Sequence, residues 1–67
     1  MNQGKGPWKG RSERKDDQDP TLQAAIENAW ENAKEDGAEP GCYVVTRITI
    51  EANNPIHAYD VTINPGS

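Results

Sequence analysis

The stretch CYVVTRITIEANNPIHAYDVTI, residues 42–63, decides the fold because it has the pattern of a β-hairpin. Aliphatic side chains in its first half fall mainly at even positions, and those in its second half fall at odd positions. If ANNP is the loop at the tip, Ile48 pairs with Tyr59 on one face and Arg47 pairs with Asp60 on the other. A one-residue slip would turn every apolar side chain to the opposite face, so the pattern specifies this register.

A helix is predicted before the hairpin, over about residues 20–36. Asp19 can cap the free N–H groups of the first turn, and Pro20 suits the first helical position because its missing donor costs nothing there. The sequence TLQAAIENAWENAKED that follows is rich in helix formers and repeats apolar side chains at helical spacing. Gly37 is expected to end the helix. The predicted fold class is therefore α+β, with one α-helix packed on a two-stranded antiparallel hairpin (α-β-β).

Residues 19–67 are predicted to form one small domain with a thin core. Only 33% of the residues are hydrophobic, and the chain has no Phe. Domains this small are usually completed by disulfides, a metal or a partner subunit. Trp30 is expected in the core or in a contact between subunits, with a place in a ligand site as the alternative. The large apolar side chains expected in the core are those of Leu22, Ile26, Trp30, Val44, Ile48, Ile50, Tyr59, Val61 and Ile63.

Residues 1–18 are predicted to be a disordered, basic tail, because they are rich in glycine and charge and show no periodic apolar pattern. Residues 1–15 carry a net charge of +4, whereas residues 16–67 carry −8. The tail is interpreted as a solubilising segment. Two alternatives are an arm that binds nucleic acid, with Trp8 stacking on a base, and a segment that docks on an acidic neighbour in an oligomer. The candidate contacts of such an arm are Lys5, Trp8, Lys9 and Arg11.

The chain has one cysteine, Cys42, and one histidine, His57. They allow no intrachain disulfide and are too few for a metal site within one chain. We expect a structural, at least half-buried Cys42, with a reactive thiol as the alternative. A cytoplasmic protein is expected because the lone cysteine allows no intrachain disulfide, and no signal core or membrane span is predicted. Without a phosphate loop, nucleophile elbow or supported carboxylate pair, no enzyme activity, catalytic residue, metal or cofactor is predicted.

The outer face of the predicted hairpin is the candidate interaction surface. A single helix can cover only one face of a hairpin, and both strand edges are left with unpaired backbone groups, which tend to recruit another chain. The expected function is therefore self-association, or binding of another protein, through the sheet. The residues predicted to form this surface are Tyr43, Val45, Arg47, Asp60 and Thr62.

The order helix, strand, turn, strand over residues 20–63, with a second strand reading HAYDVTI, resembles the C-terminal part of dodecins. Dodecins are small bacterial flavin-binding proteins in which a helix packs on a three-stranded antiparallel sheet and copies assemble into a hollow shell. The resemblance implies an oligomer and, as an alternative function, flavin binding near Tyr43 and Asp60. This chain departs from the family in three ways. No N-terminal strand is expected in residues 1–18. The family's flavin-stacking tryptophan has no equivalent near Tyr43. The family's flavin-contacting glutamine would fall at or near Asp60, where this chain has no glutamine.

Overall fold

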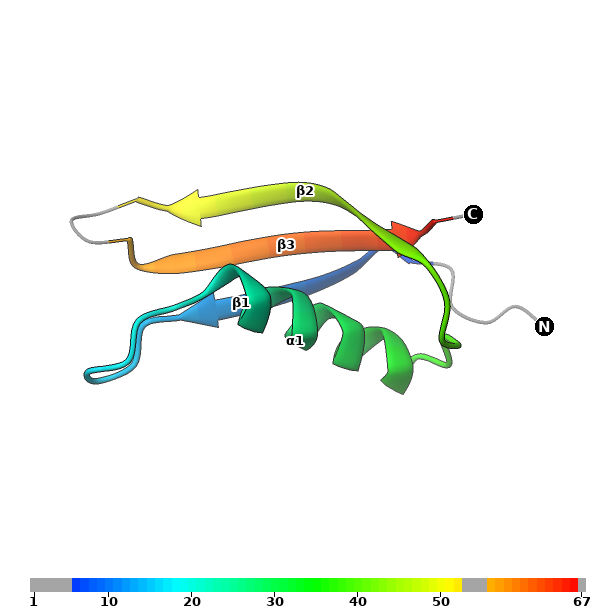
Figure 1. Cartoon of the computed structure of the whole chain (residues 1–67), viewed down its shortest axis with the longest axis horizontal. Helices are drawn as coiled ribbons and strands as arrows, with labels where there is room; N and C mark the ends of the chain where they lie inside the picture. The colour runs from blue at the N-terminus through cyan, green and yellow to red at the C-terminus, as the bar shows by residue number, and fades with distance from the viewer. Residues whose placement is uncertain (1–5, 53–55, 67) are drawn as a thin grey trace.

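The computed structural model describes residues 6–52 and 56–66 and contains one helix and three strands. Along the chain these are β1 (Trp8–Glu13), α1 (Leu22–Glu35), β2 (Tyr43–Glu51) and β3 (Ala58–Pro65). The sheet is antiparallel with the order β1-β3-β2, so the last strand is central. Figure 1 shows α1 beside β1 and β3, with β2 farther away. The α+β class is confirmed.

The prediction of a two-stranded sheet is wrong, because β1 adds a third strand from within the segment predicted to be disordered. Its residues pair in an antiparallel register with β3, from Trp8 opposite Ile63 to Glu13 opposite Ala58. The burial of β1 alternates at its start, with Trp8 and Gly10 buried and Lys9 and Arg11 exposed. A strand whose inward positions are one tryptophan and one glycine carries a weak hydrophobic signal, which explains the error.

The contact between β1 and α1 is unusually close and depends on Gly10. A Cβ atom at Gly10 would lie 2.7 Å from the Cα of Ala29 and would overlap the backbone of Ala25. The helix presents a matching row of small side chains, since Ala25, Ala29 and Ala33 are all fully buried. Glycine on the strand and alanine on the helix therefore let the two backbones approach directly.

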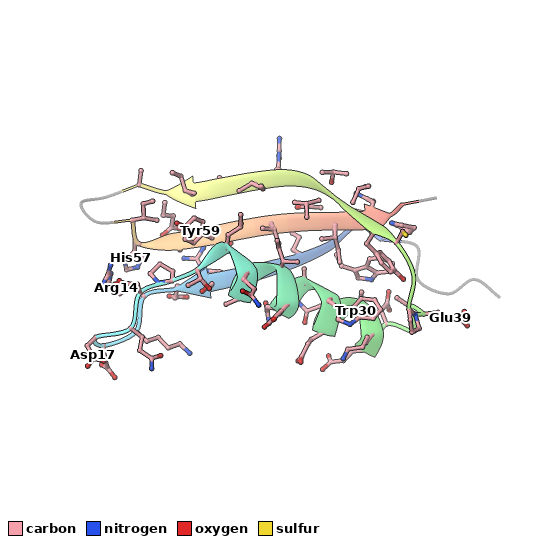
Figure 2. The ribbon with its side chains drawn as sticks, in the orientation of Figure 1. Arg14, Asp17, Trp30, Glu39, His57 and Tyr59 are labelled. Carbon is pink, nitrogen blue, oxygen red and sulfur yellow. The ribbon has the colours of Figure 1, made fainter. Side chains whose placement is uncertain are left out.

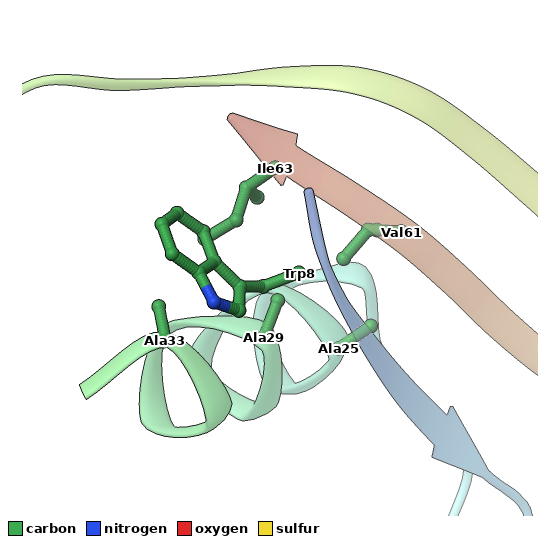
Figure 3. Close-up of a cluster of buried hydrophobic side chains, with 6 residues drawn as sticks. All are labelled: Trp8, Ala25, Ala29, Ala33, Val61 and Ile63. Carbon is green, nitrogen blue, oxygen red and sulfur yellow. The ribbon is translucent and has the colours of Figure 1, made fainter. Parts of the chain in front are cut away.

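The core is built around Trp8, which was predicted to lie in the tail. Figure 3 shows its indole ring between the alanine row of α1 and Ile63. The indole Nε1 donates a hydrogen bond to Asp36 Oδ2 at 3.1 Å, which satisfies the polar atom of a side chain only 7% exposed. Of the predicted core residues, Val61 and Ile63 are confirmed as buried, and Leu22, Ile26, Trp30 and Tyr59 are partly buried against the core. Val44, Ile48 and Ile50 are exposed, contrary to the prediction.

The two ends of α1 follow ordinary capping chemistry, with one correction at the start. Thr21, rather than Asp19, is the N-cap, and its side chain accepts a hydrogen bond from the N–H of Ala24 at 3.1 Å. Asp19 instead forms an ion pair with Arg14 at 2.8 Å. Gly37 ends the helix as predicted. It has a φ of 94°, and the N–H of the next residue, Ala38, donates to the carbonyl of Ala33.

The predicted hairpin between β2 and β3 is present, but its register differs from the prediction. Ile48 pairs with Val61, not Tyr59, and Asp60 pairs with Thr49, not Arg47. Of the predicted loop at residues 52–55, residues 53–55 lie outside the described residues.

A β-bulge at Thr46 shifts the register between β2 and β3 a second time, and it changes which face of the sheet the preceding residues of β2 occupy. Thr46 Oγ1 donates to the carbonyl of Thr62 at 3.4 Å and accepts from Asn64 Nδ2 at 2.9 Å. Beyond the bulge, Val45 pairs with Ile63 and therefore lies on the helix side of the sheet, not on the outer face. A bulge changes which face a side chain occupies without changing the sequence pattern, so the alternation alone could not reveal it.

Replacing Gly10 by Ala is expected to destabilise the fold by about 1–3 kcal/mol, because the added methyl group overlaps the backbone of α1. The change is measured by urea unfolding at a fixed protein concentration. Lys9→Ala is the matched control, since Lys9 is the exposed neighbour on β1 and its loss is expected to cost under about 0.5 kcal/mol. Equal stability of the two variants would contradict the close packing of β1 on α1.

Candidate interaction surface

The helix side of the sheet is only partly covered, because α1 packs on β1 and β3. Val45 and Ile48 lie on this side opposite Ile63 and Val61, and Ile50 lies there opposite Tyr59. These side chains are nevertheless exposed, by 38% for Val45, 52% for Ile48 and 45% for Ile50. We call these three residues the apolar strip. Three neighbouring aliphatic side chains exposed along one strand form a surface typical of interaction sites.

An aromatic cluster of Trp8, Trp30 and Tyr43 joins one end of the apolar strip to α1. Tyr43 lies on the helix side, with its ring centroid 5.1 Å from that of Trp30 and 6.1 Å from that of Trp8. The Tyr43 hydroxyl donates to the carbonyl of Glu39 at 2.5 Å, which fixes the ring. An apolar pocket of about 230 Å³ between Trp30, Tyr43, Val45 and Ile63 continues the strip toward the helix. The prediction of Tyr43 and Val45 on the outer face is therefore wrong, although both line the uncovered apolar surface.

The opposite face of the sheet, which we call the open face, is charged. Arg11 joins all three strands there, through Asp60 at 2.9 Å, Glu51 at 3.2 Å and Glu13 at 3.2 Å. Hydrogen bonds to Glu13 first, and then to Asp60 and Glu51, raise the pKa of Arg11 further above its already high usual value. The predicted pair of Arg47 with Asp60 is thus replaced by one between Arg11 and Asp60.

The other predicted residues of the outer face, Arg47 and Thr62, do lie on the open face as a pair. Lys9 is the partner of Thr62 on its other side, so the three strands place Lys9, Thr62 and Arg47 in one row. Within the described part of the chain, neither Lys9 nor Arg47 forms an ion pair. This row is therefore a small basic region on a face whose opposite end is acidic.

The residues predicted as contacts of a nucleic-acid-binding arm are not brought together as one free surface. Trp8 is buried, and its indole is not available to stack on a base. Arg11 is occupied by three carboxylates, whereas Lys9 is exposed. Lys5 lies outside the described residues. This arrangement does not match the interleaving of free cations and exposed aromatic rings that single-stranded nucleic acids require.

Cys42 and His57 lie apart from each other at opposite ends of β2. Figure 2 shows His57, Arg14 and Tyr59 at one end of the sheet and Trp30 and Glu39 toward the other. Cys42 is exposed, contrary to the prediction of a half-buried residue. Among residues 6–52 and 56–66, no group of three or more His, Cys, Asp or Glu side chains could hold a metal ion. Over the same residues, the one helix is too short and too polar to cross a membrane.

Comparison with known proteins assigns no relative to the chain. No protein-family model matches it, and no curated protein or solved structure matches it. The apolar strip contains one residue of the predicted interaction surface, Val45, and two residues predicted to lie in the core, Ile48 and Ile50. The sequence predicts Ile48 and Ile50 as core residues because the helix is expected to cover the hairpin.

Replacing Arg11 by Met is expected to lower the thermal midpoint, because three carboxylates on the open face lose their shared cation. The difference from the wild-type midpoint should shrink when the ionic strength is raised from about 0.05 to about 0.5 M, since salt screens exposed charges. Lys9→Met is the control on the same strand and face. A loss that is equal for both variants, or independent of salt, would contradict the role given to Arg11.

Proposed function

We propose that this protein is a small, non-enzymatic cytoplasmic module that acts by self-association, or by binding another protein, through the β2 side of its sheet. One observation carries the proposal. Ile48 and Ile50 lie on the face of the sheet where the core is built, and yet each is about half exposed. An apolar surface next to a core, left open by the chain's own helix, is suited to cover by a second molecule.

The apolar strip and the edge of β2 can both stabilise an association. Full burial of an aliphatic side chain stabilises by roughly 1.5–3 kcal/mol, so covering three half-exposed side chains offers on the order of 3 kcal/mol per chain. β2 is also an edge strand nine residues long, rich in β-branched residues and without proline. Long edge strands of this composition pair readily with another strand. Both features point to association through β2.

Flavin binding by a dodecin-like oligomer is the second candidate, and the strand order favours it. The order β1-α1-β2-β3, with the helix on a three-stranded antiparallel sheet, is the arrangement that the resemblance implies, and β1 supplies the N-terminal strand that the sequence was not expected to contain. Tyr43 and Asp60, however, lie on opposite faces of the sheet, so one ligand would not contact both within a single chain. Flavin absorbance in the purified protein would favour this candidate over simple association.

Replacing Ile48 by Asp is expected to leave the chain folded and to weaken association at least about tenfold, because a charge then sits in the apolar strip at the surface that a second molecule must cover. Sedimentation velocity at about 100 μM measures the association, and circular dichroism checks the fold. Gln23→Glu, which adds the same charge on the exposed side of α1, is the control. A wild-type protein that is monomeric at this concentration and binds no other protein would refute the proposal.

A further inference from the structure

We infer that two copies of this chain join through the edges of their β2 strands, which run antiparallel about a two-fold axis at Thr49. This inference rests on the proposed function and specifies the partner, the strand and the register. It is carried by three observations. The β2 edge has outward backbone groups, its side-chain pattern is complementary to itself, and the other edge of the sheet is already partly covered.

The backbone of β2 is oriented for this pairing. The carbonyl of Glu51 accepts a hydrogen bond from the N–H of His57 at 2.9 Å and so points toward β3. Because backbone groups alternate in direction along a strand, the N–H and C=O groups of Ile48 and Ile50 point away from β3. In the two-fold arrangement, Ile48 of one copy and Ile50 of the other form a hydrogen-bonded pair. Thr49 then meets its own copy on the axis.

The segment Arg47–Glu51, RITIE, is complementary to the same segment of a second chain that runs antiparallel to it. In this register Arg47 lies opposite the partner's Glu51 on the open face, and the same contact repeats on the other side of the axis. On the helix side, Ile48 lies opposite the partner's Ile50, so the two apolar strips become continuous. Moving the axis by half a residue would set residues of unlike faces against each other, and moving it by one or two residues would separate Arg47 from Glu51.

In a single chain, the side chains of Arg47 and Glu51 are both free to contact a second copy. Arg47 forms no ion pair within the described residues and is exposed at the β2 edge. Glu51 is held on the open face by Arg11, which contacts its Oε2 at 3.2 Å. A carboxylate can accept from two cations at once, so the contact with Arg11 positions Glu51 for a second one. The symmetric dimer would place Arg47 of the other copy there.

The β1 edge is less available for pairing, because side chains of α1 already occupy two of its outward backbone groups. Asn28 Oδ1 accepts from the N–H of Arg11 at 3.0 Å, and Asn32 Nδ2 donates to the carbonyl of Lys9 at 2.6 Å. These two asparagines stand one helical turn apart and occupy the positions that a neighbouring strand would need. One edge of the sheet is thus partly closed by the chain itself, and the pairing is directed to β2.

The first test is a disulfide across the proposed axis. Thr49→Cys in a Cys42→Ser background is expected to form a covalent dimer under mild oxidation, because residues at a non-hydrogen-bonded antiparallel pair lie about 4.5 Å apart at Cα. Lys9→Cys in the same background is the control, since it is exposed on the same face but at the β1 edge. Equal cross-linking of the two variants, or none in either, would overturn the inference.

The second test uses charge exchange between two variants. R47E and E51R should each self-associate about tenfold more weakly than the wild type, because each homodimer sets like charges opposite each other twice. An equimolar mixture should regain association, since the mixed dimer restores an opposite-charge pair at both contacts. Recovery supports the register. A mixture no stronger than either variant alone would overturn the register, while wild-type association in the same experiment would leave the proposed function standing. A monomeric wild type would refute both.

Discussion

The direct contact between the backbone of β1 at Gly10 and the helix at Ala25 and Ala29 is the constraint on which the structure depends. At Gly10 no side chain separates these two elements, so α1 is drawn to the β1 side of the sheet. A helix held there covers β1 and the central strand β3 and cannot also cover β2. The exposed apolar strip is therefore a consequence of where the helix is anchored, and the packing that completes the core also creates the proposed interaction surface.

The two edges of the sheet differ for the same reason. Because α1 lies over β1, its asparagine side chains reach two outward backbone groups of that strand and partly close its edge. β2 receives no such cover from the helix, and its edge carries a self-matching pattern of one cation, one anion and two isoleucines. The open face adds a shared cation, Arg11, which ties the three strands together and keeps Glu51 in place. Stability within the chain and the proposed association between chains thus involve adjoining residues.

Much of the local structure could be predicted, and the arrangement of the site could not. The helix, its stop at Gly37 and the two long strands follow from helix-forming residues, a glycine and strict alternation, all of which act between residues close in the chain. The bulge at Thr46 could not be predicted, because it depends on contacts with Thr62 and Asn64 across the sheet. The bulge moves Val45 to the helix side of the sheet, whereas the sequence predicted Val45 on the outer face.

The sequence by itself determined that the chain forms one helix and a β-hairpin, that Val61 and Ile63 are buried, and that β2 is long and rich in β-branched residues. These properties follow from propensity and period, which need no knowledge of distant neighbours. Only the tertiary structure decided that Trp8 and Gly10 belong to a third strand and that Ile48 and Ile50 face the helix side without being covered. Both outcomes depend on how closely two backbones can approach, and that distance is set by packing between segments far apart in the chain.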